Sequence, residues 1–153
     1  NNQNGFNNQN GFNNQNNFSN QNNLNCQEYS IGDDLNIRFR NKINSDETKS
    51  EIGIQIKDSN EMPIFHIMAR DSNYELNHMQ SEEEYILKIE DLRLFPGNYS
   101  INIISANTTG HEIYDIIENA LTFQIIDGGK YTVRPLPRSH GLWFLNPIWD
   151  KIH

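Results

Sequence analysis

The sequence predicts an all-β sandwich over residues 26–153. Short segments alternate apolar and polar residues with the period of two that is typical of half-buried strands. Turn-forming residues separate these segments, and no long segment has the 3.6-residue period of an amphipathic helix. Such strands bury one face and present the other to solvent or to a ligand.

The predicted strands follow one another closely along the chain. Those expected from the alternation are Leu35–Phe39, Ile52–Lys57, Ile64–Met68, Tyr85–Glu90, Tyr99–Ile104 and Leu121–Ile126. Between the second and third, Asp58-Ser59-Asn60 supplies the side chains that favour a tight turn. The sequence therefore predicts a hairpin at this point.

The remaining segments are less regular. Glu112–Ala120 fits either one helical turn or a loop between strands, and Gly128-Gly129-Lys130-Tyr131 is typical of a tight turn after a strand. Three prolines make Arg134–Pro147 extended or irregular, although Trp143-Phe144-Leu145 could form a short last strand.

The amino-terminal segment differs in composition from the rest. Of its first 24 residues, 17 are Asn or Gln and none is charged. A six-residue unit, Asn-Asn-Gln-Asn-Gly-Phe, repeats there, which leaves a short β-helix as one alternative. Because each repeat offers a single apolar residue, we expect residues 1–25 to be a low-complexity linker.

Charge and cysteine content narrow the classes of partner. The net charge is −8, whereas binding to nucleic acid or to anionic lipid requires a basic face. Cys26 is the sole cysteine, so no internal disulfide can form. The sequence shows neither a signal-peptide pattern nor an apolar run of the length that a membrane span needs.

The motifs of common catalytic sites are missing. The glycines and lysine of 128–130 do not have phosphate-loop spacing, and no histidine pairs with another histidine or a cysteine at metal-ligand spacing. A nucleophile motif is also lacking, and the acidic run Glu82-Glu83-Glu84 is typical of a solvated turn. We therefore predict a binding module with no catalytic residue, metal or cofactor.

The polar side chains suit a carbohydrate ligand. Sugars are bound by planar amide, carboxylate, guanidinium and imidazole groups that meet their hydroxyls, and by aromatic rings that cover their C–H faces. Gln55, Lys57, His66, Asn102 and Gln124 occupy outward positions of the predicted strands. The candidate ligand-binding residues are Gln55, His66, Arg70, Tyr74, Asn102, His111, Tyr114 and Asp115.

A set of ordered motifs resembles a known family. Leu94-Phe95-Pro96-Gly97-Asn98-Tyr99 is followed by Tyr114-Asp115 and then by Asn119-Ala120-Leu121-Thr122-Phe123. This order resembles the C-terminal domain of Wzt-type proteins, the ATP-binding subunits of bacterial polysaccharide ABC exporters. Tyr29–Phe39 is similar to the first strand of that family, and Gly141-Leu142-Trp143 with Trp149 is similar to its tail.

The resemblance implies an immunoglobulin-like antiparallel β-sandwich that binds an exported, O-antigen-like polysaccharide. It also implies a homodimer, sometimes with the last strand exchanged, and contact with the transmembrane subunit of the transporter through an ATPase domain of a parent polypeptide. The expected location is then cytoplasmic, peripheral to the inner membrane. This chain lacks ATPase motifs, and the Asn-rich tract stands where a linker to that domain would be.

Two alternatives remain open from the sequence. The first is a structural or protein-interaction sandwich, in which Trp143, Phe144 and Trp149 form a dimerisation or docking patch. The second is a module appended to a glycan-modifying enzyme.

Overall fold

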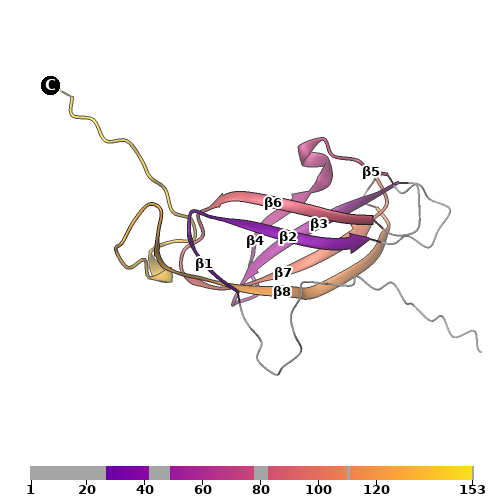
Figure 1. Cartoon of the computed structure of the whole chain (residues 1–153), viewed down its shortest axis with the longest axis horizontal. Coiled ribbons are helices and arrows are strands. Elements are labelled where there is room, and N and C mark those ends of the chain that lie inside the picture. The colour runs from indigo at the N-terminus through magenta and orange to yellow at the C-terminus, as the bar shows by residue number, and fades with distance from the viewer. Residues whose placement is uncertain (1–26, 42–48, 78–82, 110, 153) are drawn as a thin grey trace, which may run out of the picture.

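The computed structural model describes residues 27–41, 49–77, 83–109 and 111–152 (Figure 1). The prediction of an all-β sandwich is confirmed. Its elements are β1 Gln27–Ile31, β2 Asp33–Asn41, β3 Lys49–Asp58, β4 Pro63–Met68, the 3-10 turn η1 Ala69–Ser72, β5 Leu76–Asn77, β6 Glu83–Leu92, β7 Gly97–Ala106, β8 Ile113–Gly129 and the 3-10 turn η2 Arg138–His140. The proposed linker, residues 1–25, lies outside the described residues.

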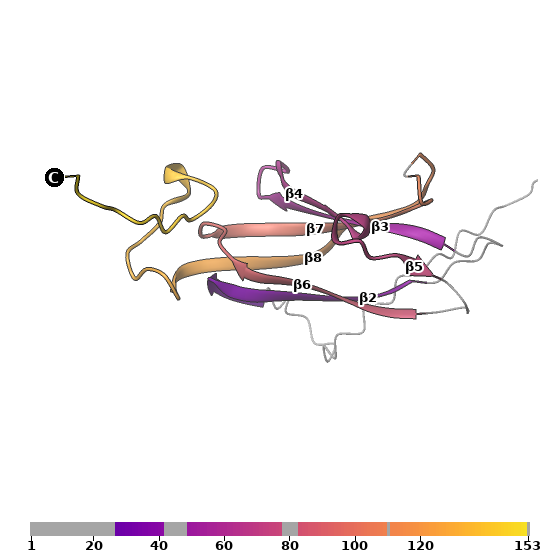
Figure 2. The same ribbon diagram turned by 90° about the horizontal axis from the view of Figure 1, so that it is seen from above.

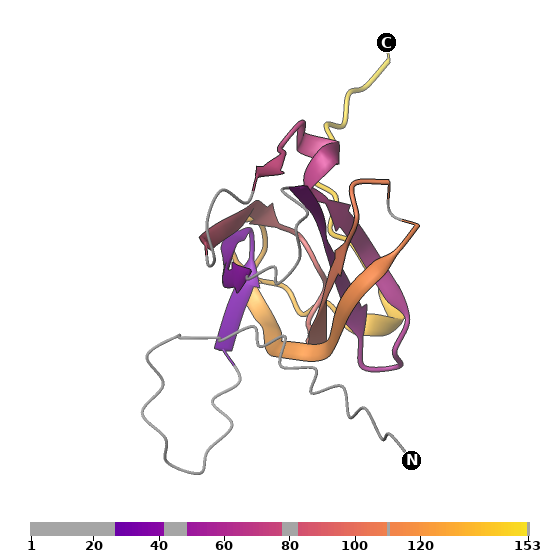
Figure 3. The same ribbon diagram turned by 90° about the vertical axis from the view of Figure 1, so that its right-hand side faces the viewer.

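The strands form two layers (Figure 2). The larger sheet has the order β1-β8-β7-β3-β4, and β5 pairs with the start of β3. The smaller sheet consists of β2 and β6. All pairs are antiparallel except β1–β8, which is parallel. Figure 3 shows the two layers from the end of the sandwich.

The core lies between the layers. Alternate residues of β2 and β3, namely Leu35, Ile37, Phe39, Ile52, Ile54 and Ile56, are at most 8% exposed. From β7 and β8 the core receives Tyr99, Ile101, Ile103, Phe123 and Ile125. Burial of these side chains supplies the main stabilising free energy, because each removes apolar area from water. The residues between them in these strands point to the opposite face of their sheet.

The segment Tyr29–Phe39, which resembles a single first strand in its sequence, forms two strands in different sheets. Tyr29–Phe39 is divided at Gly32, whose φ of +92° belongs to the left-handed region that favours glycine. The Gly32 N–H donates to the carbonyl of Leu92 at 2.8 Å, and the Ser30 N–H donates to the Asp33 carboxylate at 2.7 Å. These bonds fix the corner that carries the chain from the larger sheet to the smaller one.

Glu112–Ala120 is neither a helical turn nor a loop. From Ile113 onward it forms the first half of the long strand β8, which pairs with β7 on either side of a bulge. The pairing register of β7 with β8 shifts between Ile101 and Ile103 of β7. In the facing part of β8, Asn119 takes a φ of +50°. A bulge inserts extra residues into a ladder and breaks the period of two, which is why the alternation does not extend through this segment.

The carboxyl-terminal segment closes one end of the sandwich and then leaves it. Trp143-Phe144-Leu145 is not a strand, because only an isolated bridge between Leu94 and Trp143 forms. Leu136 and Phe144 are buried, whereas Ile148, Trp149 and Ile152 are at least 90% exposed. Residues after Leu145 run away from the sheets (Figure 1). Within the described ranges, no helix has both the length and the apolar character needed to cross a bilayer.

Candidate functional site

The outer face of the larger sheet carries a row of hydrogen-bonding side chains. In β7, Tyr99, Ile101 and Ile103 face the core, so the intervening Asn98, Ser100 and Asn102 face outward. Sheet register then aligns Asn102 with Gln55 of β3, and Gln55 with His66 of β4. Three of the candidate residues predicted from the sequence thus lie side by side on one face.

Hydrogen bonds hold the inner part of this row. The Asn102 Nδ2 group donates to Gln55 Oε1 at 3.3 Å, and Asn102 Oδ1 accepts the backbone N–H of Asn119 at 2.9 Å. Asn102 is therefore only 7% exposed, and we expect it to orient Gln55 more than to contact a ligand. His66 is the exposed end of the row.

A glycine makes room beside His66. A Cβ placed on Gly53 would lie 3.0 Å from Met68 Sδ and 3.3 Å from His66 Nε2. The side chains of β4 therefore fold over β3 at a position where β3 has no side chain of its own. This packing sets the orientation of the imidazole.

Lys57 is not the solvent-facing residue that the alternation predicts. It is 7% exposed, and its ammonium group forms an ion pair with Glu61 of the β3–β4 turn. The turn has no glycine, and Glu61 itself takes the left-handed conformation with φ of +62°. A long basic side chain can lie along a surface while its charge reaches an acidic partner, which explains its burial.

The β3–β4 turn is also anchored by Asp58. Its Oδ1 accepts the N–H groups of Asn60 and Met62 at 2.9 and 3.0 Å, and its Oδ2 accepts from Arg138 at 2.8 Å. Burial alone would raise the pKa of Asp58, but these donors outweigh it and lower that pKa below its ordinary value. Arg138 thereby ties η2 to the hairpin.

A polar hollow lies on the outer face next to this turn. Its volume is about 320 Å³. It is lined by Asp58, Ser59, Glu61, Asn98, Tyr99, Ser100, Asn119, Thr122 and Phe123. None of the lining residues was among the candidate ligand-binding residues predicted from the sequence. Asp58 and Ser59 were named only as turn residues, and five others only as parts of the motifs that carry the family resemblance, namely Asn98, Tyr99, Asn119, Thr122 and Phe123. Asn98 and Ser100 could have been found from their spacing, because they lie two and four residues before Asn102 on the same strand and so share its face.

Two further candidates, Arg70 and Tyr74, lie in a second group at the end where η1 packs. The Arg70 guanidinium is 3.4 Å from the Glu51 carboxylate, and the Arg70 N–H donates to the same carboxylate at 3.1 Å. Together with Thr108 of the β7–β8 turn they line a hollow of about 450 Å³. In this hollow the charges of Arg70 and Glu51 are paired with each other.

The last three candidates belong to the β7–β8 connection and to β8. His111 is exposed, and its backbone N–H donates to Asn107 Oδ1 at 3.1 Å. Asp115 stands opposite Ser105, one position from the outward-facing pair of Ile104 and Ile116. Tyr114 is half-buried next to it. The structure does not place these residues in the row of His66, Gln55 and Asn102.

An apolar groove of about 330 Å³ opens between the two sheets, along β6 and β4. Phe39 stacks on Tyr85 at a centroid distance of 5.6 Å, and Tyr74 meets Tyr85 edge-on at 6.5 Å. Burial, followed by a hydrogen bond to Glu83, raises the pKa of Tyr85. The groove is thus an extension of the core with one aromatic rim.

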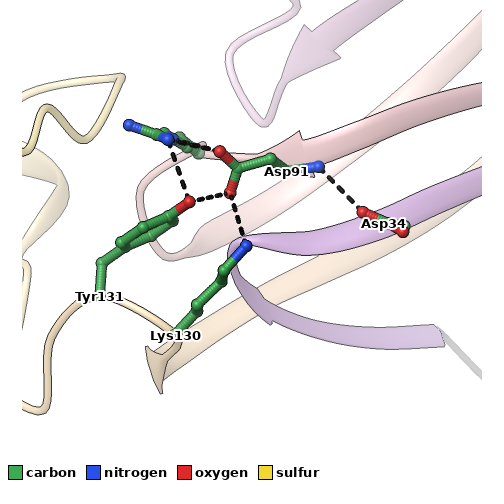
Figure 4. Close-up of polar contacts among 5 residues, drawn as sticks. Asp34, Asp91, Lys130 and Tyr131 are labelled. Atoms are coloured by element: carbon green, nitrogen blue, oxygen red, sulfur yellow. Dashed lines mark hydrogen bonds and ion pairs between the residues drawn. The ribbon is translucent and has the colours of Figure 1, made fainter.

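A charged cluster joins the carboxyl-terminal segment to the sheets (Figure 4). Asp91 has a φ of +55°, and its N–H donates to Asp34 Oδ1 at 3.0 Å. Its carboxylate accepts a hydrogen bond from Arg93 Nε at 2.8 Å and another from the Tyr131 hydroxyl at 2.6 Å. Lys130 Nζ lies 4.0 Å from Asp91 Oδ1. Hydrogen bonds from Arg93 and then from Tyr131 lower the pKa of Asp91. Since Arg93 also lies 4.4 Å from the Tyr131 ring centroid, the cluster serves as a clamp for the segment after β8.

Geometry alone defines the class of protein. It is an all-β sandwich whose larger sheet carries amide, imidazole and hydroxyl side chains on its outer face. In the part of the chain that the structure describes, no three acidic, histidine or cysteine side chains gather as a metal site would require.

The chain belongs to the Wzt C-terminal domain family, whose model matches residues 15–143. This family is a non-catalytic domain associated with the O-antigen ABC transporter. A solved structure described as the C-terminal domain of wzt superposes with a TM-score of 0.65 at 9% identity, covering 82% of this chain and 74% of that one. At that identity the likeness shows the fold alone. No curated protein sequence matches the chain.

Proposed function

We propose that this domain binds a polysaccharide destined for export and recruits it to an ABC transporter. The observation that carries the proposal is the outward row of His66, Gln55 and Asn102, continued by the polar hollow at the β3–β4 turn. These groups offer both donors and acceptors, as hydroxyl-rich ligands require. Family membership supports the transporter context.

The wider arrangement follows the same reasoning. We place the domain on the cytoplasmic side of the inner membrane, attached through residues 1–25 as a linker to a parent ATPase domain. Contact with the transmembrane subunit would run through that domain, and two copies would associate as a homodimer. Sedimentation of the 153-residue chain tests the dimer independently of the glycan.

Titration with the polysaccharide purified from the source organism tests the main proposal. Calorimetry on the 153-residue chain should give saturable binding that is weakened by Gln55→Ala with His66→Ala. Arg134→Ala is a suitable control, because Arg134 is exposed and lies after β8, beyond the sheet. Absence of binding by the unaltered chain would exclude the proposal.

A second candidate function is protein association through the tail. Ile148, Trp149 and Ile152 are 97%, 90% and 97% exposed, which is unusual for large apolar side chains. Trp143 packs edge-on against Phe65 at 5.3 Å and Phe144 is buried, so of the three residues expected in a docking patch Trp149 is the one fully available. If the tail mediates association, Trp149→Ala should reduce it while glycan binding is unchanged.

A further inference from the structure

The hollow at the β3–β4 turn has one feature that its own residues leave unexplained. Ser100 is 9% exposed, and its Oγ is a buried side-chain oxygen without a hydrogen-bond partner among the described residues. A buried hydroxyl that makes no hydrogen bond costs free energy, so such groups are rare in folded proteins. Ser100 faces outward from β7 and is one of the residues that line the hollow.

β7, which carries Asn98 and Ser100 of the hollow, cannot accept a backbone as an added strand. It is hydrogen-bonded to β3 and β8 on its two sides. Extended peptides bind by adding to an unpaired sheet edge, which β7 does not offer. Recognition at β7 must therefore come from side chains.

Those side chains define the chemistry of the ligand. Asn98, Asn119, Ser59, Ser100 and Thr122 contribute neutral amides and hydroxyls, and no basic residue lines the hollow. The two nearby cations are already engaged, Lys57 with Glu61 and Arg138 with Asp58. An anionic group would meet carboxylates and no free cation, whereas a neutral polyol would find donors and acceptors.

We infer that this hollow is a subsite for one neutral sugar unit, with Ser100 Oγ hydrogen-bonded to a sugar hydroxyl. The volume of about 320 Å³ lies at the small end of ligand pockets, which suits a single ring. The inference deepens the proposed function and rests on it. It assigns the specificity for neutral over acidic sugars to the turn end of the outer face, about the positions of Ser100, Asn119 and Thr122.

Amide chemical shifts of the full 153-residue chain provide the test. The probes are the methyl glycosides of glucose, galactose, mannose and N-acetylglucosamine, with glucuronic acid as the anionic comparison. At least one neutral glycoside should produce saturable shifts at the amides of Ser100, Asn119 and Thr122. Glucuronic acid should not.

Ser100→Ala is the decisive variant. Because its hydroxyl makes no bond within the described structure, its removal should leave the unfolding midpoint unchanged or slightly raised. The dissociation constant for the neutral glycoside should rise about fivefold, as for the loss of one hydrogen bond. Ser105→Ala, on the same strand but facing away from the hollow, should leave binding unchanged.

Three results would overturn the subsite: no shift with any of the four neutral glycosides, shifts confined to the Gln55 and His66 amides, or wild-type affinity in Ser100→Ala. Titration with the purified polysaccharide separates this failure from failure of the proposed function. If the polysaccharide binds but the residues of the hollow do not respond, only the subsite is rejected. If a glycoside binds in the hollow but the polysaccharide does not bind, the export role is rejected and the subsite is retained.

Discussion

The side-chain oxygen Oδ1 of Asn102 accepts the backbone N–H of Asn119 at 2.9 Å, across the bulge where β8 slips against β7. A bulged backbone leaves polar groups without ladder partners. The Asn102 side chain accepts a hydrogen bond from one of these groups, the Asn119 N–H, and at the same time donates to Gln55. One amide thus couples the bulge to the row of candidate ligand contacts.

Replacing Asn102 should destabilise the domain more than replacing its neighbour in the row. Asn102→Ala removes both hydrogen bonds from a residue that is 7% exposed, and we expect a loss of roughly 1–2 kcal/mol in the free energy of unfolding. Gln55→Ala removes only the 3.3 Å bond and should cost less than about 0.5 kcal/mol. Urea denaturation of the two variants measures the difference. Equal stability would contradict this role for the Asn119 bond.

Gly53→Ala should move His66 without unfolding the sheet. The added Cβ would come within 3.0 Å of Met68 Sδ and 3.3 Å of His66 Nε2, and both are far ends of side chains that can shift. We expect changed imidazole resonances of His66 and a fall in polysaccharide affinity, with a stability change below about 1 kcal/mol. Imidazole resonances identical to those of the unaltered protein would show that Gly53 does not set the orientation of His66.

Two adjacent glycines at the end of β8 allow a matched comparison of alanine substitutions. Gly128 and Gly129 have φ of +98° and +110°, so alanine at either position is strained by roughly 1–2 kcal/mol. A Cβ on Gly129 would also lie 2.4 Å from the backbone oxygen of Ile31, whereas a Cβ on Gly128 would meet nothing within 4 Å. Gly129→Ala should therefore lower the melting temperature clearly more than Gly128→Ala. A similar loss in both would mean that β1 adjusts to the added methyl group.

Stability should decline at acidic pH in a way that depends on Arg138. The pKa of Asp58 is lower in the folded protein than in the unfolded chain, so its stabilising contribution is complete above the unfolded pKa of about 3.9. That contribution is lost as the pH falls through the folded pKa. Arg138→Gln should reduce stability near neutral pH and flatten the decline below about pH 4.

Arg134→Gln is the control for this experiment, because it removes the same charge from an exposed position. Urea midpoints measured from about pH 7 to about pH 3 should separate the two variants. Parallel pH profiles for Arg138→Gln and the unaltered protein would show that the 2.8 Å contact with Asp58 does not contribute to the acid response.

The sequence alone determined the fold class and most of the strands. Alternation in Leu35–Phe39, Ile52–Lys57 and Tyr99–Ile104 follows directly from burial of one face, so it can be read without knowing any partner strand. Motifs around Pro96 and Asn119 were enough to indicate the Wzt C-terminal domain family, which the family match over residues 15–143 confirms.

Tertiary structure decided which outward positions are accessible. Asn102 and Lys57 face away from the core yet are buried, because Asn119 and Glu61 reach them from segments that the period of two does not describe. Only the register of β3, β4 and β7 brings Gln55, His66 and Asn102 into one row. The fold also brings Glu61 of the β3–β4 turn and Ser100 of β7 to the same hollow. Alternation specifies the face of a strand, whereas pairing between distant segments specifies which side chains on that face meet.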